Sequence, residues 1–92
     1  MDKELLFITV IGQDRKGIVA KISDYLYRCN INIEDINQKV MADYFVMVTL
    51  VDMKTSRRPL EQINRELQIL GKKLKLTVVI QHENIFKMMH RI

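Results

Sequence analysis

The sequence predicts an α+β fold of the ferredoxin-like type, βαββαβ, with a four-stranded antiparallel sheet, two helices on one face and a short C-terminal helix. Two apolar segments of strand length, 5–11 and 44–51, are rich in β-branched residues. Two other segments, 18–29 and 60–70, repeat their apolar residues at helical spacing instead. Right-handed crossover connections then bring both helices to the same face of the sheet.

The first βα unit has clear boundaries. The segment from Leu5 to Ile11 is apolar on both alternating faces, as expected of a central strand. Residues 12–17 contain two glycines and four polar residues, which predicts a loop. Asn30 is expected to end the following helix, because asparagine tolerates the left-handed conformation. The apolar face of that helix comprises Ile18, Ile22, Tyr25, Leu26 and Cys29.

The second half begins with a hairpin. Residues 31–40 alternate only in part, which indicates a strand with one solvated face, near an edge or with a bulge. A turn at 41–43 leads to an almost wholly apolar strand at 44–51. Pro59 suits the first turn of the second helix, and Gly71 is expected to cap its end. A fourth strand at 74–81 and a short amphipathic helix at 83–92 complete the pattern.

Length and composition predict one domain, 1–92, whose residues 82–92 form a helical tail. The net charge of +4 is mild and the basic residues are scattered along the chain, so a nucleic-acid partner is not expected. The single cysteine, Cys29, excludes a disulfide within the chain. With neither a signal peptide nor an apolar run of about 20 residues, the chain is expected in the cytoplasm and not in a membrane.

The central strands also predict a homodimer. Helices on one side of the sheet bury one set of apolar side chains, and the opposite set would remain exposed in a monomer. The tail helix and a partner subunit are both able to cover it. The first strand contributes Leu6, Ile8 and Val10 opposite Leu5, Phe7 and Ile11, and the third strand Phe45, Met47 and Val51 opposite Tyr44, Val46, Val48 and Leu50.

Two motifs resemble the ACT domain family. The loop Asp14-Arg15-Lys16-Gly17 is similar to that family's Asp-Arg-Pro-Gly loop, and Asn30-Ile31-Asn32-Ile33 is similar to its Gly-x-Asn-Ile entry to the second strand. Lys16 and Asn30 differ from the family's proline and glycine. The ending 81–92 is similar to the stand-alone single-domain ACT proteins of bacteria and archaea. The loop 12–17 is similar to that of glycine cleavage repressor-type ACT domains.

The resemblance implies regulation through a small ligand, most simply an amino acid bound where two subunits meet. It also implies that each subunit's site includes the loop after the first strand, the start of the first helix and the start of the second strand. Carried over residue by residue, the expected ligand-binding residues are Gln13, Asp14, Arg15, Lys16, Gly17, Ile18 and Asn32.

Elementary chemistry supports such a site and also offers structural alternatives. A glycine at a helix start lets backbone N–H groups approach a carboxylate, and the helix dipole favours that charge. Asn32 has both a donor and an acceptor for an amino acid's two charged groups. Asp14 serves equally well as a helix cap, Gly17 as a turn residue, and Asn32 as a polar strand residue.

The sequence contains no pattern that indicates an enzyme, a cofactor or a metal site. His82-Glu83 lacks the second histidine of a zinc protease motif, because Phe86 stands in its place. His82 and His90 are therefore expected to be surface or interface residues. Cys29, on the apolar face of a helix, is expected to be a packing residue.

Two alternative functions remain at this point. One is an adaptor that binds an unidentified protein target without a small ligand. The other is an RNA-binding domain, since Leu6-Phe7-Ile8 is loosely similar to the first strand of the RNA-recognition motif. The third strand, however, begins Asp43-Tyr44-Phe45-Val46 and lacks that motif's basic residue and glycine.

Overall fold

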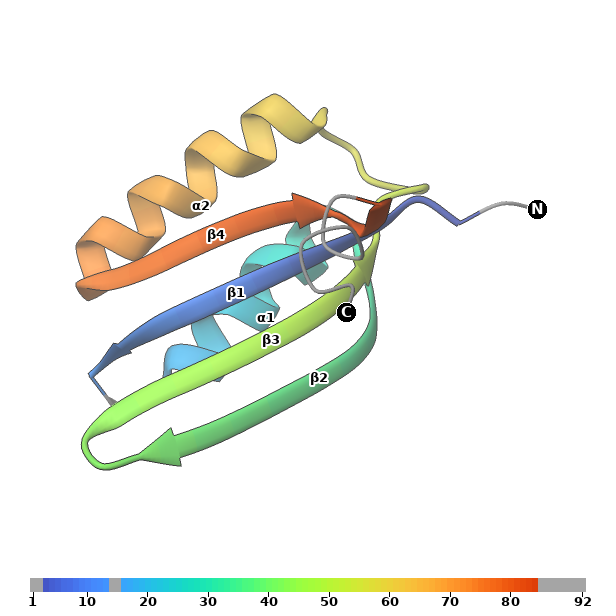
Figure 1. Cartoon of the computed structure of the whole chain (residues 1–92). Helices are drawn as coiled ribbons and strands as arrows, with labels where there is room; N and C mark the ends of the chain where they lie inside the picture. The colour runs from blue at the N-terminus through green and yellow to red at the C-terminus, as the bar shows by residue number, and fades with distance from the viewer. Residues whose placement is uncertain (1–2, 14–15, 85–92) are drawn as a thin grey trace.

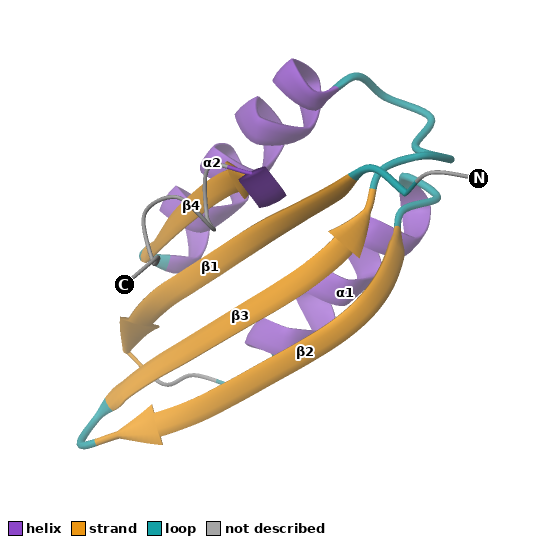
Figure 2. Cartoon of the chain, turned by 45° about the vertical axis from the view of Figure 1, so that its right-hand side comes forward, coloured by secondary structure: helices purple, strands orange, loops and turns teal. Residues whose placement is uncertain are grey.

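The computed structural model describes residues 3–13 and 16–84, and it has a four-stranded sheet with two helices against one face (Figures 1 and 2). The strand order is β2-β3-β1-β4, and every neighbouring pair is antiparallel. The predicted ferredoxin-like fold is confirmed. In chain order, the elements are β1 (Leu5–Gln13), α1 (Ile18–Arg28), β2 (Asn32–Met41), β3 (Tyr44–Asp52), α2 (Leu60–Leu74) and β4 (Leu76–His82).

The core lies between the sheet and the helices, as the alternating pattern predicted. In the central strands β1 and β3, side chains that point toward the helices are buried, and their neighbours on the opposite face are half-buried or exposed. That opposite face is called the open face below. The strand residues of the core are Leu6, Ile8, Val10, Phe45, Met47, Val51, Leu76 and Val78, and its helix residues include Ile18, Ile22, Leu26, Ile63 and Leu67.

The end of α1 confirms the prediction for Asn30. Its φ of 60° is left-handed, and its backbone N–H donates to Tyr27 O at 3.0 Å. The Asn30 amide donates to Thr55 O at 3.0 Å, and the Thr55 hydroxyl donates back to Asn30 O at 3.0 Å. This reciprocal pair joins the α1–β2 connection to the segment before α2.

The prediction that Gly71 caps α2 is wrong. The helix continues to Leu74 and ends at Lys75, whose φ of 58° is left-handed, so β4 begins at Leu76 rather than at residue 74. Gly71 is buried instead where α2 packs on β4. A Cβ there would lie 2.8 Å from Val78 Cγ2 and 3.2 Å from Leu76 O. The glycine is therefore needed for close packing rather than for a turn.

The prediction that the loop begins at Gly12 is also wrong. Gly12 and Gln13 are the last residues of β1, and Gly12 pairs with both Phe45 of β3 and Leu76 of β4. A Cβ on Gly12 would lie 2.5 Å from Leu76 Cδ2. Gly12 thus keeps its place in the sheet and makes room for the Leu76 side chain.

β2 is an edge strand with a bulge, and both features were predicted as alternatives. Its pairing with β3 shifts between Ile33 and Asp35, so Glu34 is the extra residue.

At the other end of the chain, Glu83 and Asn84 are helical, while the rest of the predicted tail helix, 85–92, lies outside the described residues. Within the described ranges, neither helix has the length and apolar character needed to cross a membrane.

Candidate ligand-binding site

The loop between β1 and α1 presents several of the predicted site residues at one end of the sheet. Gln13 is the exposed last residue of β1, and Lys16 and Gly17 form an exposed turn. Ile18, the first residue of α1, points into the core and is 2% exposed, so only its backbone is available to a ligand. Asp14 and Arg15 lie outside the described residues.

Gly17 is the N-cap residue of α1. Its φ of 84° and ψ of 3° are left-handed, and apart from its chain neighbours no atom of the described residues lies within 4 Å of the position a Cβ would take. Its carbonyl accepts the first helical bond, from Lys21 N at 2.9 Å. Conformation, not lack of space, therefore requires glycine here.

The start of α1 is a candidate anion site. The first N–H groups of any helix have no partner within the helix, and the helix dipole makes this end electropositive. Gly17 supplies no side-chain cap, and the first turn of α1 contains no acidic residue. A ligand carboxylate is chemically suited to these donors.

Asn32 lies at the opposite end of the sheet from this loop. It pairs with Asp52, which pairs with Leu5 at the start of β1, whereas Gln13 at the end of β1 pairs with Tyr44. At about 3.4 Å per residue, the two ends of β1 are about 27 Å apart. α1 carries the chain back along the sheet before β2 begins, so one subunit does not bring Asn32 and the loop together (Figure 1).

The Asn32 side chain takes part in a small polar cluster. Its amide donates to the Glu34 carboxylate, which also forms an ion pair with Lys3. The hydrogen bond to Glu34 raises the pKa of Lys3. Nearby, Asp52 accepts from Lys54 N and Glu4 N at 3.0 Å each, and these bonds lower the pKa of its carboxyl.

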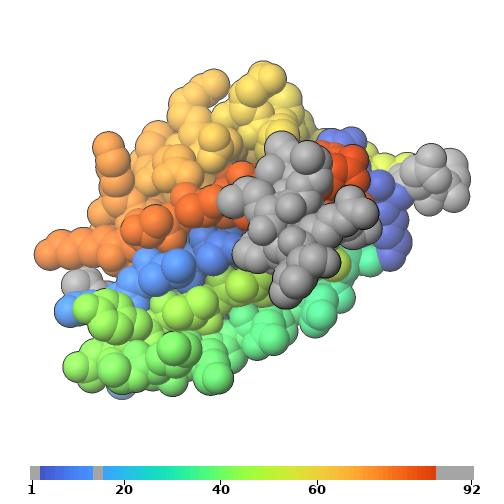
Figure 3. All heavy atoms as spheres, viewed as in Figure 1, coloured from blue at the N-terminus to red at the C-terminus, as the bar shows by residue number. Residues whose placement is uncertain are grey.

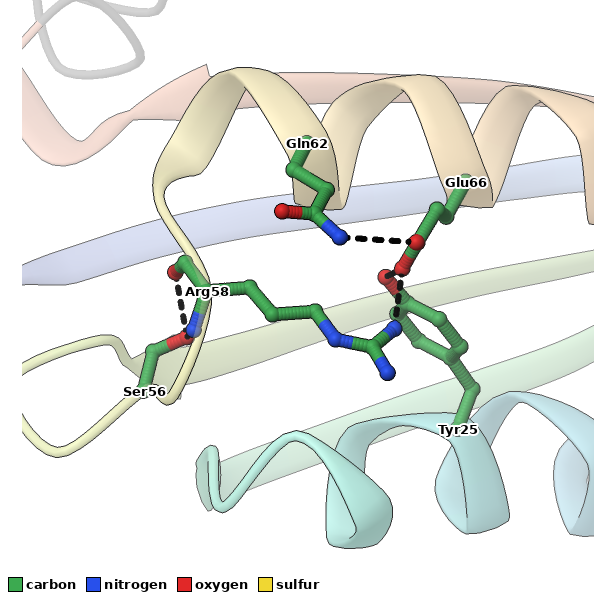
Figure 4. Close-up of polar contacts among 5 residues, drawn as sticks. All are labelled: Tyr25, Ser56, Arg58, Gln62 and Glu66. Carbon is green, nitrogen blue, oxygen red and sulfur yellow. Dashed lines mark hydrogen bonds and ion pairs between the residues drawn. The ribbon is translucent and has the colours of Figure 1, made fainter.

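A second polar cluster, which sequence reasoning missed, joins the two helices (Figure 4). The Glu66 carboxylate of α2 accepts a hydrogen bond from the Tyr25 hydroxyl of α1 at 2.6 Å and one from Gln62 Nε2 at 3.1 Å. It also forms an ion pair with Arg58. The sequence did contain one signal for this cluster, which is the position of Tyr25 on the apolar face of α1. A buried tyrosine hydroxyl usually finds a hydrogen-bond partner.

The bonds to Glu66 set its protonation state. The hydroxyl of Tyr25, followed by the amide of Gln62 and the guanidinium of Arg58, lowers the pKa of Glu66 to about 2. Burial, together with the bond to Glu66, raises the pKa of Tyr25. An ionised Glu66 and a neutral Tyr25 at neutral pH make this cluster a clamp between helices rather than an acid–base pair.

Metal ligands do not converge in the described part of the chain. No group of three or more histidine, cysteine, aspartate or glutamate residues is placed there to hold an ion. Cys29 is fully buried and His82 Nδ1 accepts from Asn84 N at 3.2 Å. His90 lies outside the described residues.

Similar proteins place this fold in a family. A UPF0237 protein of Methanopyrus kandleri and one of Methanocaldococcus jannaschii are each 47% identical to this chain over 85 residues, which cover 92% of this chain and 94% of each relative. An ACT domain protein from Streptococcus pneumoniae superposes with a TM-score of 0.80 at 31% identity, covering 94% of this chain and 97% of that one.

A more distant structure is similar in fold alone. It is a candidate glycine cleavage system transcriptional repressor with a TM-score of 0.76 at 21% identity, and the match covers 89% of this chain but 47% of that one. The profile of the ACT domain family matches residues 4–81. The resemblance carried by the loop 14–17 and by residues 30–33 is confirmed, and the chain belongs to the ACT domain family.

Proposed function

We propose that this chain is a non-catalytic regulatory protein of the cytoplasm that binds an amino acid as a homodimer. Membership of the ACT domain family, whose members are typically regulatory and bind ligands, supports the general role. The observation that carries the amino-acid assignment is the exposed, left-handed Gly17 at the start of α1. Gly17 itself has no side chain to cap the first amides of that helix, and a carboxylate suits such donors.

The dimer is proposed to form through the free edge of β2. This ten-residue strand pairs with β3 on one side, and no other strand of the described sheet lies on its outer side. Ile36, Val40 and Met41 are 39%, 54% and 55% exposed along it. Unpaired edges of this length attract a second strand, and a two-fold axis would pair the same edge of both subunits.

This geometry completes the ligand site, which favours it over a dimer through the open face. A two-fold axis at the β2 edge makes the two β2 strands antiparallel. The start of one strand, at Asn32, then approaches the end of the partner strand, where Met41 pairs with Tyr44 and Tyr44 with Gln13. Asn32 of one subunit would thus face the loop of the other, with the amide near the ligand's ammonium and the helix start near its carboxylate.

A thermal-shift screen against the amino acids, with light scattering on the same sample, tests the proposal. A ligand that binds only the folded protein raises its melting temperature, and the rise grows with the logarithm of the ligand concentration above Kd. We expect a dimer that one amino acid stabilises, and we expect Asn32→Ala and Gln13→Ala each to abolish the shift. Asn64→Ala, on the exposed surface of α2, is the matched control and retains it.

Two outcomes would contradict this function. A dimer that no amino acid stabilises would favour the adaptor, which binds a protein target without a small ligand. A folded monomer would remove the shared site, because Asn32 and Gln13 lie at opposite ends of the sheet within one subunit.

A further inference from the structure

The open face of the sheet carries a groove that the proposed amino-acid site does not use. Its volume is about 450 Å³, within the range of small-molecule sites. It follows β2 and β3, the green strands along the lower border of the face seen in Figure 3. A dimer through the β2 edge would not itself cover this face.

The groove has an apolar floor and a polar wall. Val46, Val48 and Leu50 of β3 line the floor and are half-buried. Asp35, Asn37 and Lys39 of β2 line the wall and are exposed. The strand register sets each wall residue beside one floor residue: Asp35 beside Leu50, Asn37 beside Val48 and Lys39 beside Val46.

The wall carries opposite charges at its two ends. Because side chains two residues apart on a strand share a face, Asp35, Asn37 and Lys39 form one row. At about 3.3 Å per residue, the ends of the row are about 13 Å apart at their Cα atoms. Within residues 3–13 and 16–84, the ion pairs involve neither Asp35 nor Lys39.

We propose that this groove binds a short peptide with free termini, extended along β2 and β3. Its ammonium group would lie at Asp35, its carboxylate at Lys39 and its apolar side chains on Val46, Val48 and Leu50. Asn37, at the middle of the row, would donate to and accept from the peptide backbone.

Length distinguishes this ligand from a single amino acid. An extended chain spans about 3.3–3.6 Å per residue, so a peptide of about three or four residues matches the row. The two charged groups of one amino acid are separated by only two bonds and reach one end of the row at a time. The groove and the loop site therefore select different ligands.

The test is an NMR titration of the full chain with the tripeptide Leu-Ala-Leu, followed through the methyl groups of Val46, Val48 and Leu50. The same peptide is titrated with its amino terminus acetylated and with its carboxyl terminus amidated, and free leucine is titrated alongside. We expect the free tripeptide to shift these methyl signals. Each blocked terminus should weaken binding about two- to fivefold, as for exposed ion pairs.

Variants assign each terminus to its partner. Acetylation should weaken binding to the wild-type protein but not to Asp35→Asn, and amidation should weaken binding to the wild type but not to Lys39→Met. Glu61→Gln and Lys72→Met, which change exposed residues of α2, are the matched controls and should bind like the wild type. Gln13→Ala should not change peptide affinity, so the outcome is separate from that of the amino-acid site.

Three results would overturn the proposal. The first is the absence of methyl shifts with any peptide. The second is equal binding of free and blocked peptides, which would show that the charged row recognises no termini. The third is a change of the methyl signals with protein concentration in the absence of peptide, or a weaker dimer in Asp35→Asn. Either would mean that a second copy of the chain contacts Asp35 and Lys39.

Discussion

At the scale of single residues, the hydroxyl of Thr49 is an unusual feature of the core. Thr49 is 1% exposed on the helix-facing side of β3, and its Oγ1 has no hydrogen-bond partner among the described residues. Burial of an unpaired hydroxyl costs free energy, whereas a methyl group of the same size does not. Thr49→Val is therefore expected to stabilise the fold by about 1 kcal/mol.

Urea unfolding at neutral pH measures this change as a higher midpoint at an unchanged slope. Thr77→Val, at an exposed position of β4, is the matched control and should change the free energy of unfolding little. A destabilised Thr49→Val would mean that the hydroxyl does have a partner.

Glu66 makes stability depend on pH in the acid range. Its pKa is about 2 in the folded protein, against 4.5 for an unperturbed group. A folded-state pKa below the unfolded one means that the unfolded chain binds the proton more readily. The stability from this group is thus fully present above pH 4.5 and is lost as the pH falls toward 2.

We expect Glu66→Gln to lower the free energy of unfolding at pH 7 and to flatten its dependence on pH between about 5 and 2. A series of urea midpoints across this range measures both effects. Glu61→Gln, five residues earlier on α2 and exposed, should follow the wild-type curve. Parallel curves for Glu66→Gln and the wild type would contradict the clamp.

At the scale of elements, the contact between α2 and β4 depends on Gly71. In a free helix, glycine to alanine is favourable by about 1 kcal/mol. Here the added Cβ would lie 2.8 Å from Val78 Cγ2, so Gly71→Ala is expected to destabilise the protein, by about 1–3 kcal/mol. A double-mutant cycle with Val78→Ala, measured by urea unfolding, should show a smaller cost when the valine methyl is removed. If Gly71→Ala costs the same with and without the Val78→Ala change, the added Cβ clashes with Leu76 O instead.

The elements that the sequence predicted well are those that periodicity alone determines. β1 and β3 are apolar on both faces, and both are central strands. Gly71 and Lys75 were not predictable, because a glycine that permits close packing looks like a helix cap in sequence. A left-handed lysine has no sequence signal at all. The Tyr25–Glu66 bond was equally hidden, since it joins residues 41 positions apart.

The ligand-binding residues implied by the resemblance remain a prediction, and the structure shows how one subunit arranges those that it describes. Resemblance placed Gln13, Gly17 and Asn32 in one subunit's site, whereas the topology separates Asn32 from the loop. In any chain with the order β1-α1-β2, the helix returns along the sheet, so the loop after β1 and the start of β2 lie at opposite ends of the sheet. Only the relation between two subunits is able to bring these residues together, and one chain's sequence does not contain it.

At the scale of the whole molecule, the proposed dimer predicts that defective subunits complement each other. Lys16→Ala damages the loop of a subunit and Asn32→Ala damages the start of its β2, so each homodimer has two defective sites. In a mixed dimer, the intact loop of one subunit faces the intact Asn32 of the other. One site is then restored and the other carries both defects.

Mixing the two variants after unfolding and refolding should therefore recover ligand stabilisation that neither has alone. With random pairing, about half of the dimers are mixed and each has one working site, so calorimetry should find about a quarter of the wild-type number of sites. Refolding each variant by itself is the control. No recovery in mixed dimers would mean that each site lies within one subunit, and the β2 edge would then have no part in binding.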